Sequence, residues 1–350
     1  MNPRKYFAFV FIGVGSLLSS TYGSTHNWQS YLQIRYTLSD EQNDYTSLRR
    51  LKLYGQGPIL GDWNYYVQFL YKANNQSPTD YRVVIQEANA TIRLKSLKLT
   101  VGQFKPPFGL ERFTSDALLA LIDRSQPTDR LIPNGSLGWS FARARGVQIE
   151  KRIRPSAQLA LGIFEGNGAN QSFCGNGPLI AGRITYEPAL NHSRRLRSEL
   201  AFSWRKDHDI NFLGQLPGAP PNYANFVGSD LRENMAFAYD FGNNSIRSEY
   251  FAAQYSSDDP SLPSIDAKGY YFQWAYYASS RKWSAAMRYE VMDPDRSVTN
   301  SKDICWFTIG ATYYLDCDHQ KIQANYVFKS EKINKADNDV LLIQYQQFLM

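Results

Sequence analysis

The segment VGQFKPPFGLERFTS, residues 101–115, marks the point at which a regular strand pattern stops. Residues typical of β-strands lead up to Phe104, and Pro106 and Pro107 follow. Proline has no backbone N–H to donate to a neighbouring strand, so we expect the strand to end here. Residues 106–140 then show no clear period. A connection this long is uncommon in a compact domain and is usually functional.

Sixteen segments of the chain alternate between apolar and polar residues, as half-buried strands do. In the first, Leu32, Ile34 and Tyr36 share one face, and Arg35 falls on the other. The segments are residues 28–38, 48–56, 65–73, 82–94, 97–104, 141–153, 157–165, 179–187, 194–206, 231–241, 245–255, 267–278, 282–292, 303–315, 319–331 and 339–349. An even strand number is typical of bacterial outer-membrane barrels.

The connections between these segments alternate between short and long. Residues 57–62, 95–96 and 242–244 are short, whereas SDEQND, GNGANQSFCGNG and SSDDPSLPSID are long and polar. Short turns at one end and long loops at the other are what an up-and-down outer-membrane barrel requires. The sequence therefore predicts an all-β, transmembrane, antiparallel barrel of about sixteen strands over residues 24–350. Its third long loop, residues 106–140, would fold into the lumen as a constriction loop.

The N-terminus has the three parts of a secretory signal. Arg4 and Lys5 precede an apolar run over residues 6–18, and small and polar residues continue to Gly23. This pattern predicts a signal peptide over residues 1–23 and export. A membrane-anchor helix is the alternative, but such a helix needs about 20 apolar residues. No later window has a long apolar run, so the mature protein would cross a membrane only as strands.

Composition agrees with a barrel and excludes other classes. Aromatic residues make up 15% of the 350 residues, with 24 Tyr and 20 Phe, which suits aromatic girdles, although an aromatic-rich soluble β protein would show it too. The mean hydropathy of −0.44 argues against a bundle of membrane helices. The net charge is +6. The basic residues alternate singly along strands and form no patch or tail, so we expect no nucleic-acid partner.

The two faces of the expected strands differ in charge. Over residues 282–292, Trp283 and Met287 share one face, and Arg288 and Glu290 share the other. A charge facing lipid would cost about 2–4 kcal/mol at mid-bilayer, so the charged face must line the lumen. The same reasoning assigns to a basic lumen wall Arg35, Arg50, Lys52, Lys72, Arg195, Arg197, Arg247 and Arg288. Fewer acids fall on this face, which predicts a preference for anions.

One segment breaks the alternation. Arg143 and Arg145 fall on the same parity as Val147 and Ile149. We expect a β-bulge at Gly146, which would restore both arginines to the lumen side.

The lumen charges leave two interpretations open. In the first, arginines bind oxyanions, because the planar guanidinium matches phosphate and carboxylate oxygens. In the second, acids such as Glu87 and Glu199 pair with the basic residues across neighbouring strands, and no selectivity beyond net sign results.

VGQFKPPFGLE, together with LIDRS at 121–125 and RARGVQIE at 143–150, resembles the third-loop region of the phosphate-selective porin O and P family. The motif match covers residues 95–165, and elsewhere the resemblance rests on strand rhythm. It implies a homotrimeric barrel in the lipid outer membrane of a Gram-negative-type bacterium. It also implies passage of small anions, phosphate among them, past a basic constriction formed by loop three.

Positions in these motifs indicate which residues reach the constriction. Lys105 lies in FKPPFG and Arg124 in LIDRS, and Arg143 and Arg145 would lie on the adjoining wall. We assign these four residues as the candidate anion-binding set.

Three alternatives stay open. Arg124 could form a local salt bridge to Asp123 or Asp129 that merely shapes the loop. The barrel could be a general or sugar-conducting porin without phosphate specificity. An outer-membrane enzyme is a third option, although the four histidines show no HExxH pattern and there is no GxSxG. We expect no cofactor, no metal and no enzymatic activity.

Overall fold

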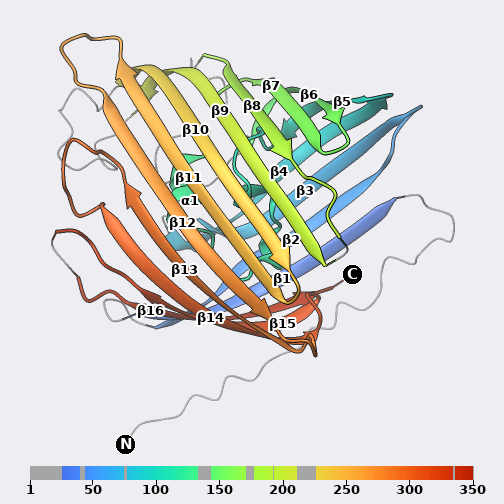
Figure 1. Ribbon diagram of the computed structural model, residues 1–350, viewed down its shortest axis with the longest axis vertical. Coiled ribbons are helices and arrows are strands. Elements are labelled where there is room, and N and C mark those ends of the chain that lie inside the picture. Colours follow the sequence, from blue (N-terminus) through green and yellow to red (C-terminus); the bar gives the residue numbers. More distant parts are fainter. Residues whose placement is uncertain are drawn as a thin grey trace, which may run out of the picture.

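The computed structural model describes residues 26–39, 44–74, 77–132, 143–170, 177–191, 193–210, 226–333 and 336–349, without the side chains of 72–74, 77–82, 209 and 210. Within these ranges, sixteen antiparallel strands form one closed barrel, in which each strand pairs with its sequence neighbours and β1 pairs with β16 (Figure 1). The expected signal peptide, residues 1–23, and residues 133–140 of the third loop lie outside the described residues. No helix in the described chain is long and apolar enough to cross a membrane.

The expected strand number is confirmed, with some shifted boundaries. The strands are β1 (Asn27–Ser39), β2 (Tyr45–Pro58), β3 (Trp63–Asn74), β4 (Ser77–Leu94), β5 (Leu97–Phe104), β6 (Ala144–Arg154), β7 (Ala157–Phe164), β8 (Leu179–Tyr186), β9 (Arg194–Ile210), β10 (Phe226–Phe241), β11 (Asn244–Ser257), β12 (Ile265–Tyr277), β13 (Trp283–Asp293), β14 (Ile304–Asp316), β15 (Gln320–Phe328) and β16 (Val340–Phe348). The third loop holds two short 3-10 helices, η1 (Glu111–Phe113) and η2 (Asp116–Leu118), and one α-helix, α1 (Gln126–Leu131).

The strands separate an apolar outer face from a polar inner face, as the alternation predicts. In β9, Leu200 is 55% exposed and Phe202 is 43% exposed, whereas Glu199 and Arg205 on the opposite face are each 2% exposed. The outward row offers apolar side chains to lipid, and the inward row keeps its charges away from it.

The seam between the first and last strands closes the ring. Gln33 of β1 donates a 2.7 Å hydrogen bond from Nε2 to Oε1 of Gln346 on β16. The rings of Tyr31 and Phe348 stack with centroids 5.1 Å apart. Closure pairs β1 with β16, so the sheet has no open first or last strand.

The bulge expected at Gly146 is not present, because β5 and β6 pair there in regular register, with Gly102 opposite Gly146. A Cβ atom at Gly146 would lie 2.3 Å from the carbonyl oxygen of Ile163. Glycine is therefore needed at this position for the close approach of β7 and not for a bulge. The alternation continues unbroken through Arg145.

Candidate functional site

The described part of the third loop lies across the inside of the barrel. Midway along it, Asp116 Oδ2 lies 2.5 Å from the Lys52 Nζ of β2. At its last described residue, the carbonyl oxygen of Ile132 accepts a hydrogen bond from Arg232 of β10. Strands β2 and β10 stand half-way round the ring from each other, and both basic side chains belong to the buried inner face. The loop thus spans the lumen between opposite walls.

Serine residues begin the two helices η2 and α1 of this loop. Ser115 accepts a hydrogen bond from the N–H of Ala117, and Ser125 accepts one from the N–H of Thr128, each at 3.3 Å. Pro127 lies in the first turn of α1, where a missing N–H costs nothing. These caps fix where each helix begins, because they satisfy N–H groups that have no partner within the helix.

Further contacts tie the loop backbone to the wall. Glu249 of β11 accepts hydrogen bonds from the N–H groups of Leu110 and Glu111, both at 2.7 Å. Lys321 of β15 donates from Nζ to the carbonyl oxygen of Ala117 at 2.7 Å. Backbone groups that would otherwise be buried without partners are satisfied by inward side chains of several strands.

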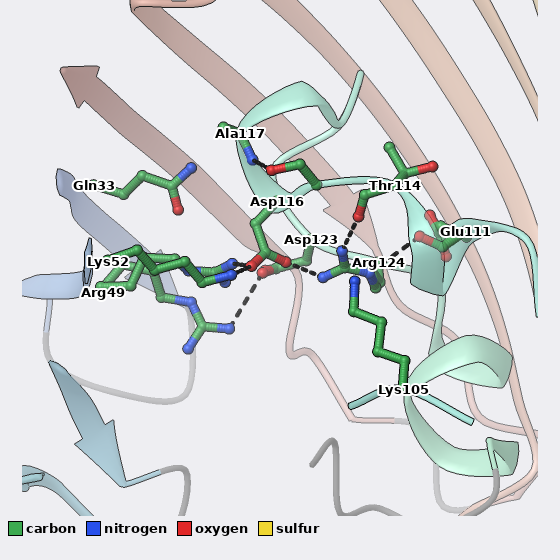
Figure 2. A network of polar contacts seen from close by, with 12 residues as sticks. Gln33, Arg49, Lys52, Lys105, Glu111, Thr114, Asp116, Ala117, Asp123 and Arg124 are labelled. Atoms are coloured by element: carbon green, nitrogen blue, oxygen red, sulfur yellow. Dashed lines mark hydrogen bonds and ion pairs between the residues drawn. The ribbon is translucent and has the colours of Figure 1, made fainter. Parts of the chain in front are cut away.

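Asp116 joins three basic side chains from the loop and the wall (Figure 2). Arg124 forms an ion pair with Asp116, and Arg50 Nη1 and Lys52 Nζ each lie 2.5 Å from its Oδ2. Burial acts to raise the pKa of Asp116, but the charges of Arg124, Arg50 and Lys52 outweigh it and hold that pKa well below its usual range. Asp116 therefore stays ionised and neutralises part of this basic cluster.

Asp123 forms a second link between the loop and the first strands. Arg35 donates to both oxygens of its carboxylate, at 2.7 and 3.0 Å, and Arg49 lies 3.5 Å away. On the other side of the loop, Arg288 of β13 donates to the Asp123 carbonyl oxygen at 2.9 Å. Arg35 and Arg288, both expected in the basic wall, thus hold the loop in position.

Arg124 lies in the lumen with its side chain 9% exposed. Arg124 forms its ion pair with Asp116 and not with Asp123 or Asp129, the partners considered in the alternative interpretation of the sequence. The contact nevertheless lies within the loop, as that alternative required. The guanidinium also donates to the Thr114 carbonyl oxygen at 2.5 Å.

Lys105 and Arg143 meet at Glu87 of β4. Arg143 Nη2 lies 3.0 Å from Glu87 Oε1, and Lys105 Nζ lies 4.0 Å from the same oxygen. Burial, followed by the nearby charge of Arg143, holds the pKa of Lys105 well below its ordinary value. The structure brings these two residues together, as the motif positions indicated.

Arg145 does not join them. It occupies the outward row of β6 with Val147 and Ile149, its side chain is 46% exposed, and it pairs with Glu165 at 2.7 Å. Arg145 faces outward because the register is regular at Gly146. Arg143 precedes the first residue of β6 and lies on the inner side. The expected position of Arg145 on the lumen wall is therefore wrong.

The loop and strands β2–β4 surround a cavity of about 250 Å³ that contains three of the four candidate residues. Its lining has seven basic side chains and four acidic ones. The basic residues are Arg49, Arg50, Lys52, Lys105, Arg112, Arg124 and Arg143, and the acidic residues are Glu87, Asp116, Asp123 and Asp129. Positive charge is therefore in excess around this cavity. We call it the loop cavity.

Arg49 was not expected to line the lumen, because strict alternation assigns it to the face opposite Arg50. The pairing of β1 with β2 shifts between Gln33 and Ile34, so Gln33 lies opposite Arg50 and Ile34 opposite Leu48. Arg49 is the extra residue of this bulge, and both arginines reach the cavity. Two successive basic residues in an otherwise alternating strand are the feature of the sequence that could have indicated this bulge.

A larger cavity of about 840 Å³ lies beside the short connections after β8 and β10. Arg195, Arg197 and Arg247, all expected in the basic wall, line it together with Arg194. We call it the turn-side cavity. Phe113 and Thr114 line both cavities. The side chain of Lys72, the remaining residue of the expected wall, lies outside the described part of the structure.

In the described ranges, no group of three or more His, Cys, Asp or Glu side chains is placed to hold a metal ion.

Comparison with known proteins agrees with this architecture. Residues 22–347 match the family model of the phosphate-selective porins O and P. Porin O of Pseudomonas aeruginosa is 24% identical over 269 residues, which cover 69% of this chain and 60% of that protein. The chain thus spans less than two thirds of the length of this relative.

Two solved structures show the same fold at low identity. An anion-selective porin from Comamonas acidovorans has a TM-score of 0.68 at 10% identity, over 93% of this chain and 99% of that one. The trimer form of OmpT, an outer membrane protein of Vibrio cholerae, has a TM-score of 0.63 at 10% identity, with the same coverage. Because the family model covers nearly the whole chain, this outer-membrane barrel belongs to the phosphate-selective porin O and P family.

Proposed function

We propose that the protein is a passive outer-membrane channel for small anions, with phosphate and related oxyanions as its preferred solutes. The observation that carries this proposal is the loop cavity, in which seven basic side chains face four acidic ones inside the lumen. A water-filled passage with such an excess raises the local concentration of anions and repels cations. Membership of a porin family favours a channel over the enzyme alternative.

The chemistry of the donors favours oxyanions over halides. Five of the seven basic side chains are arginines, whose planar N–H groups match phosphate or carboxylate oxygens in pairs. An arriving oxyanion would exchange part of its hydration for these donors. Asp116 already engages Arg50, Lys52 and Arg124, so the anion must share them with a fixed carboxylate. Sharing limits affinity, and conduction requires an anion to leave as readily as it enters.

The turn-side cavity continues the basic path. Arg197 and Arg247 are partly neutralised there, by Glu187 at 2.9 Å and by Asp240 at 2.7 Å.

We include a homotrimer in the proposal, supported by the motif resemblance and by the shared fold with the trimer form of OmpT. Mass measurement of the detergent-solubilised protein tests this, and a single-chain mass would contradict it.

A general or sugar-conducting porin is the second candidate, because Tyr66 lines the loop cavity and its ring lies 6.4 Å from that of Tyr54. Two neighbouring aromatic rings of this kind offer stacking surface to a sugar. The cavity that they adjoin is strongly basic, however, and an uncharged sugar gains nothing from that charge.

Planar-bilayer recording separates the two functions. We expect a reversal potential in a KCl gradient that shows chloride selectivity, and a chloride current that millimolar phosphate blocks. Lys105→Gln and Arg143→Gln should each reduce both effects. Arg145→Gln, which removes a charge from the outer face, is the matched control and should behave as the wild type. An unselective current that phosphate does not change would contradict the anion channel and favour the general porin.

A further inference from the structure

Phe113 stands where the two cavities meet, and two basic side chains lie over its ring. Lys105 Nζ is 5.6 Å from the ring centroid, and the guanidinium carbon of Arg183, from β8, is 4.2 Å from it. Phe113 is 37% exposed and lines both the loop cavity and the turn-side cavity. An apolar ring therefore forms part of the boundary between two charged compartments.

The backbone that carries this ring is fixed. Phe113 ends η1, and its N–H bonds to the carbonyl oxygen of Leu110 at 3.1 Å. The N–H groups of Leu110 and Glu111 in turn donate to the carboxylate of Glu249 on β11. The ring thus has a defined place in the lumen, set by the barrel wall.

The two cations over the ring are only weakly paired with carboxylates. Lys105 Nζ lies 4.0 Å from Glu87, and Arg183 Nη1 lies 3.8 Å from Glu199. Both separations are at the outer limit of an ion pair. The Nε and Nη1 groups of Arg183 are buried and make no hydrogen bond to the described residues. Buried donors without partners are costly, so they favour an acceptor that reaches them.

Other cations of the lumen are held differently. Arg50 and Lys52 each lie 2.5 Å from Asp116, and such a contact neutralises their charge. An aromatic face attracts a cation through its quadrupole and carries no net charge. A ring can therefore position a cation and leave its full charge available.

We propose that Lys105, Phe113 and Arg183 form an anion-binding junction between the two cavities, in which Phe113 positions both cations without neutralising them. The inference rests on the proposed anion channel and names a site within it. An oxyanion in the loop cavity already meets Lys105, and at the junction it would gain Arg183 as well. The ring also narrows the passage, and because its apolar surface offers no hydrogen bonds, the passing ion exchanges lost water only for the donors of the two cations.

Three substitutions of Phe113 separate the role of the ring charge distribution from that of its size. Phe113→Tyr keeps the aromatic face, so we expect it to retain the phosphate block. Phe113→Leu keeps apolar volume but removes the face, so we expect phosphate block to weaken by about two- to fivefold with little change in conductance. Phe113→Ala should weaken the block and also raise single-channel conductance and admit a larger anion such as gluconate. Phe237→Leu, on the outer face of β10, is the matched control.

Recording of purified channels that insert into a bilayer restricts the comparison to folded protein. If Phe113→Ala does not insert, the comparison of phosphate block in Phe113→Leu and Phe113→Tyr still tests the proposed junction. Equal phosphate block in the wild type, Phe113→Tyr and Phe113→Leu would overturn the junction while leaving the anion channel intact. A wild-type channel without anion selectivity would overturn the proposed function itself.

Discussion

Asp116 Oδ2 and Lys52 Nζ lie 2.5 Å apart and connect the third loop to the second strand. The contact places a fixed negative charge at the centre of the basic cavity, where Arg50 and Arg124 share the same carboxylate. One residue therefore links the attachment of the loop to the channel selectivity that we propose.

Asp116→Asn should raise anion selectivity, because three cations then keep their full charge. The same change leaves buried cations without their counter-charge, so we expect the free energy of unfolding to fall by about 3–5 kcal/mol. Reversal potentials and denaturant midpoints measure the two effects. Asp240→Asn, in the turn-side cavity, is the control for an acid with a more exposed side chain. Unchanged selectivity in Asp116→Asn would contradict a neutralising role for Asp116.

We expect Lys105 to make the selectivity of the channel depend on pH. A lysine whose pKa is lowered in the folded protein loses its charge as pH rises through the lowered value, before an ordinary lysine would. We expect chloride selectivity to fall as pH rises over the range below 10.5, the ordinary lysine value. Lys105→Arg should keep its charge and flatten the dependence, and Lys105→Gln should show low selectivity throughout. A wild-type profile that matches Lys105→Arg at every pH would contradict this expectation.

Glu249→Gln should loosen the start of the third loop. The carboxylate accepts two backbone N–H groups at once, whereas an amide offers only one acceptor oxygen. Loss of one charge-assisted hydrogen bond predicts that the amides of Leu110 and Glu111 exchange about tenfold faster or more. Hydrogen-exchange mass spectrometry of this segment measures the change. Glu187→Gln, at the turn-side cavity, should leave the exchange rates of these amides at the wild-type value. Equal exchange rates in both variants would show that Glu249 does not hold the start of the loop in place.

Gly146→Ala should destabilise the barrel. The added methyl group would lie 2.3 Å from the carbonyl oxygen of Ile163, so strands β6 and β7 must separate or shift. Overpacking of this kind costs about 1–3 kcal/mol. Val147→Ala, at the next position and on the outer face, is the control for a change in residue size. If Gly146→Ala matched the control in its denaturant midpoint, the close approach of β7 would not be the reason for glycine.

The strands could be predicted because a period of two is visible in the sequence itself. Where that period is locally broken, the prediction failed. A bulge placed Arg49 in the lumen, and regular pairing kept Arg145 outside it. The sequence shows where the alternation is broken, at Arg49 and Arg50 and at Arg145. It does not show whether pairing with the neighbouring strand forms a bulge there.

The partners of the third loop could not be predicted for a different reason. Lys321 bonds to the carbonyl oxygen of Ala117 across 204 positions, and this contact depends on the register of strands that follow the loop in the chain. Basic and acidic residues of the loop were visible in the sequence. Which of them pair with each other, and which face a cavity, is decided by the complete ring.

The seam between Gln33 and Gln346 has a consequence for biogenesis. These residues are 313 positions apart, so the barrel closes only after its last strand has been synthesised. Bringing such distant ends together costs on the order of 5 kcal/mol in chain entropy, and contacts of high sequence separation slow folding. Until then the nascent protein carries two open strand edges that can pair with other chains. A polypeptide truncated before β16 should accumulate as aggregate in the periplasm.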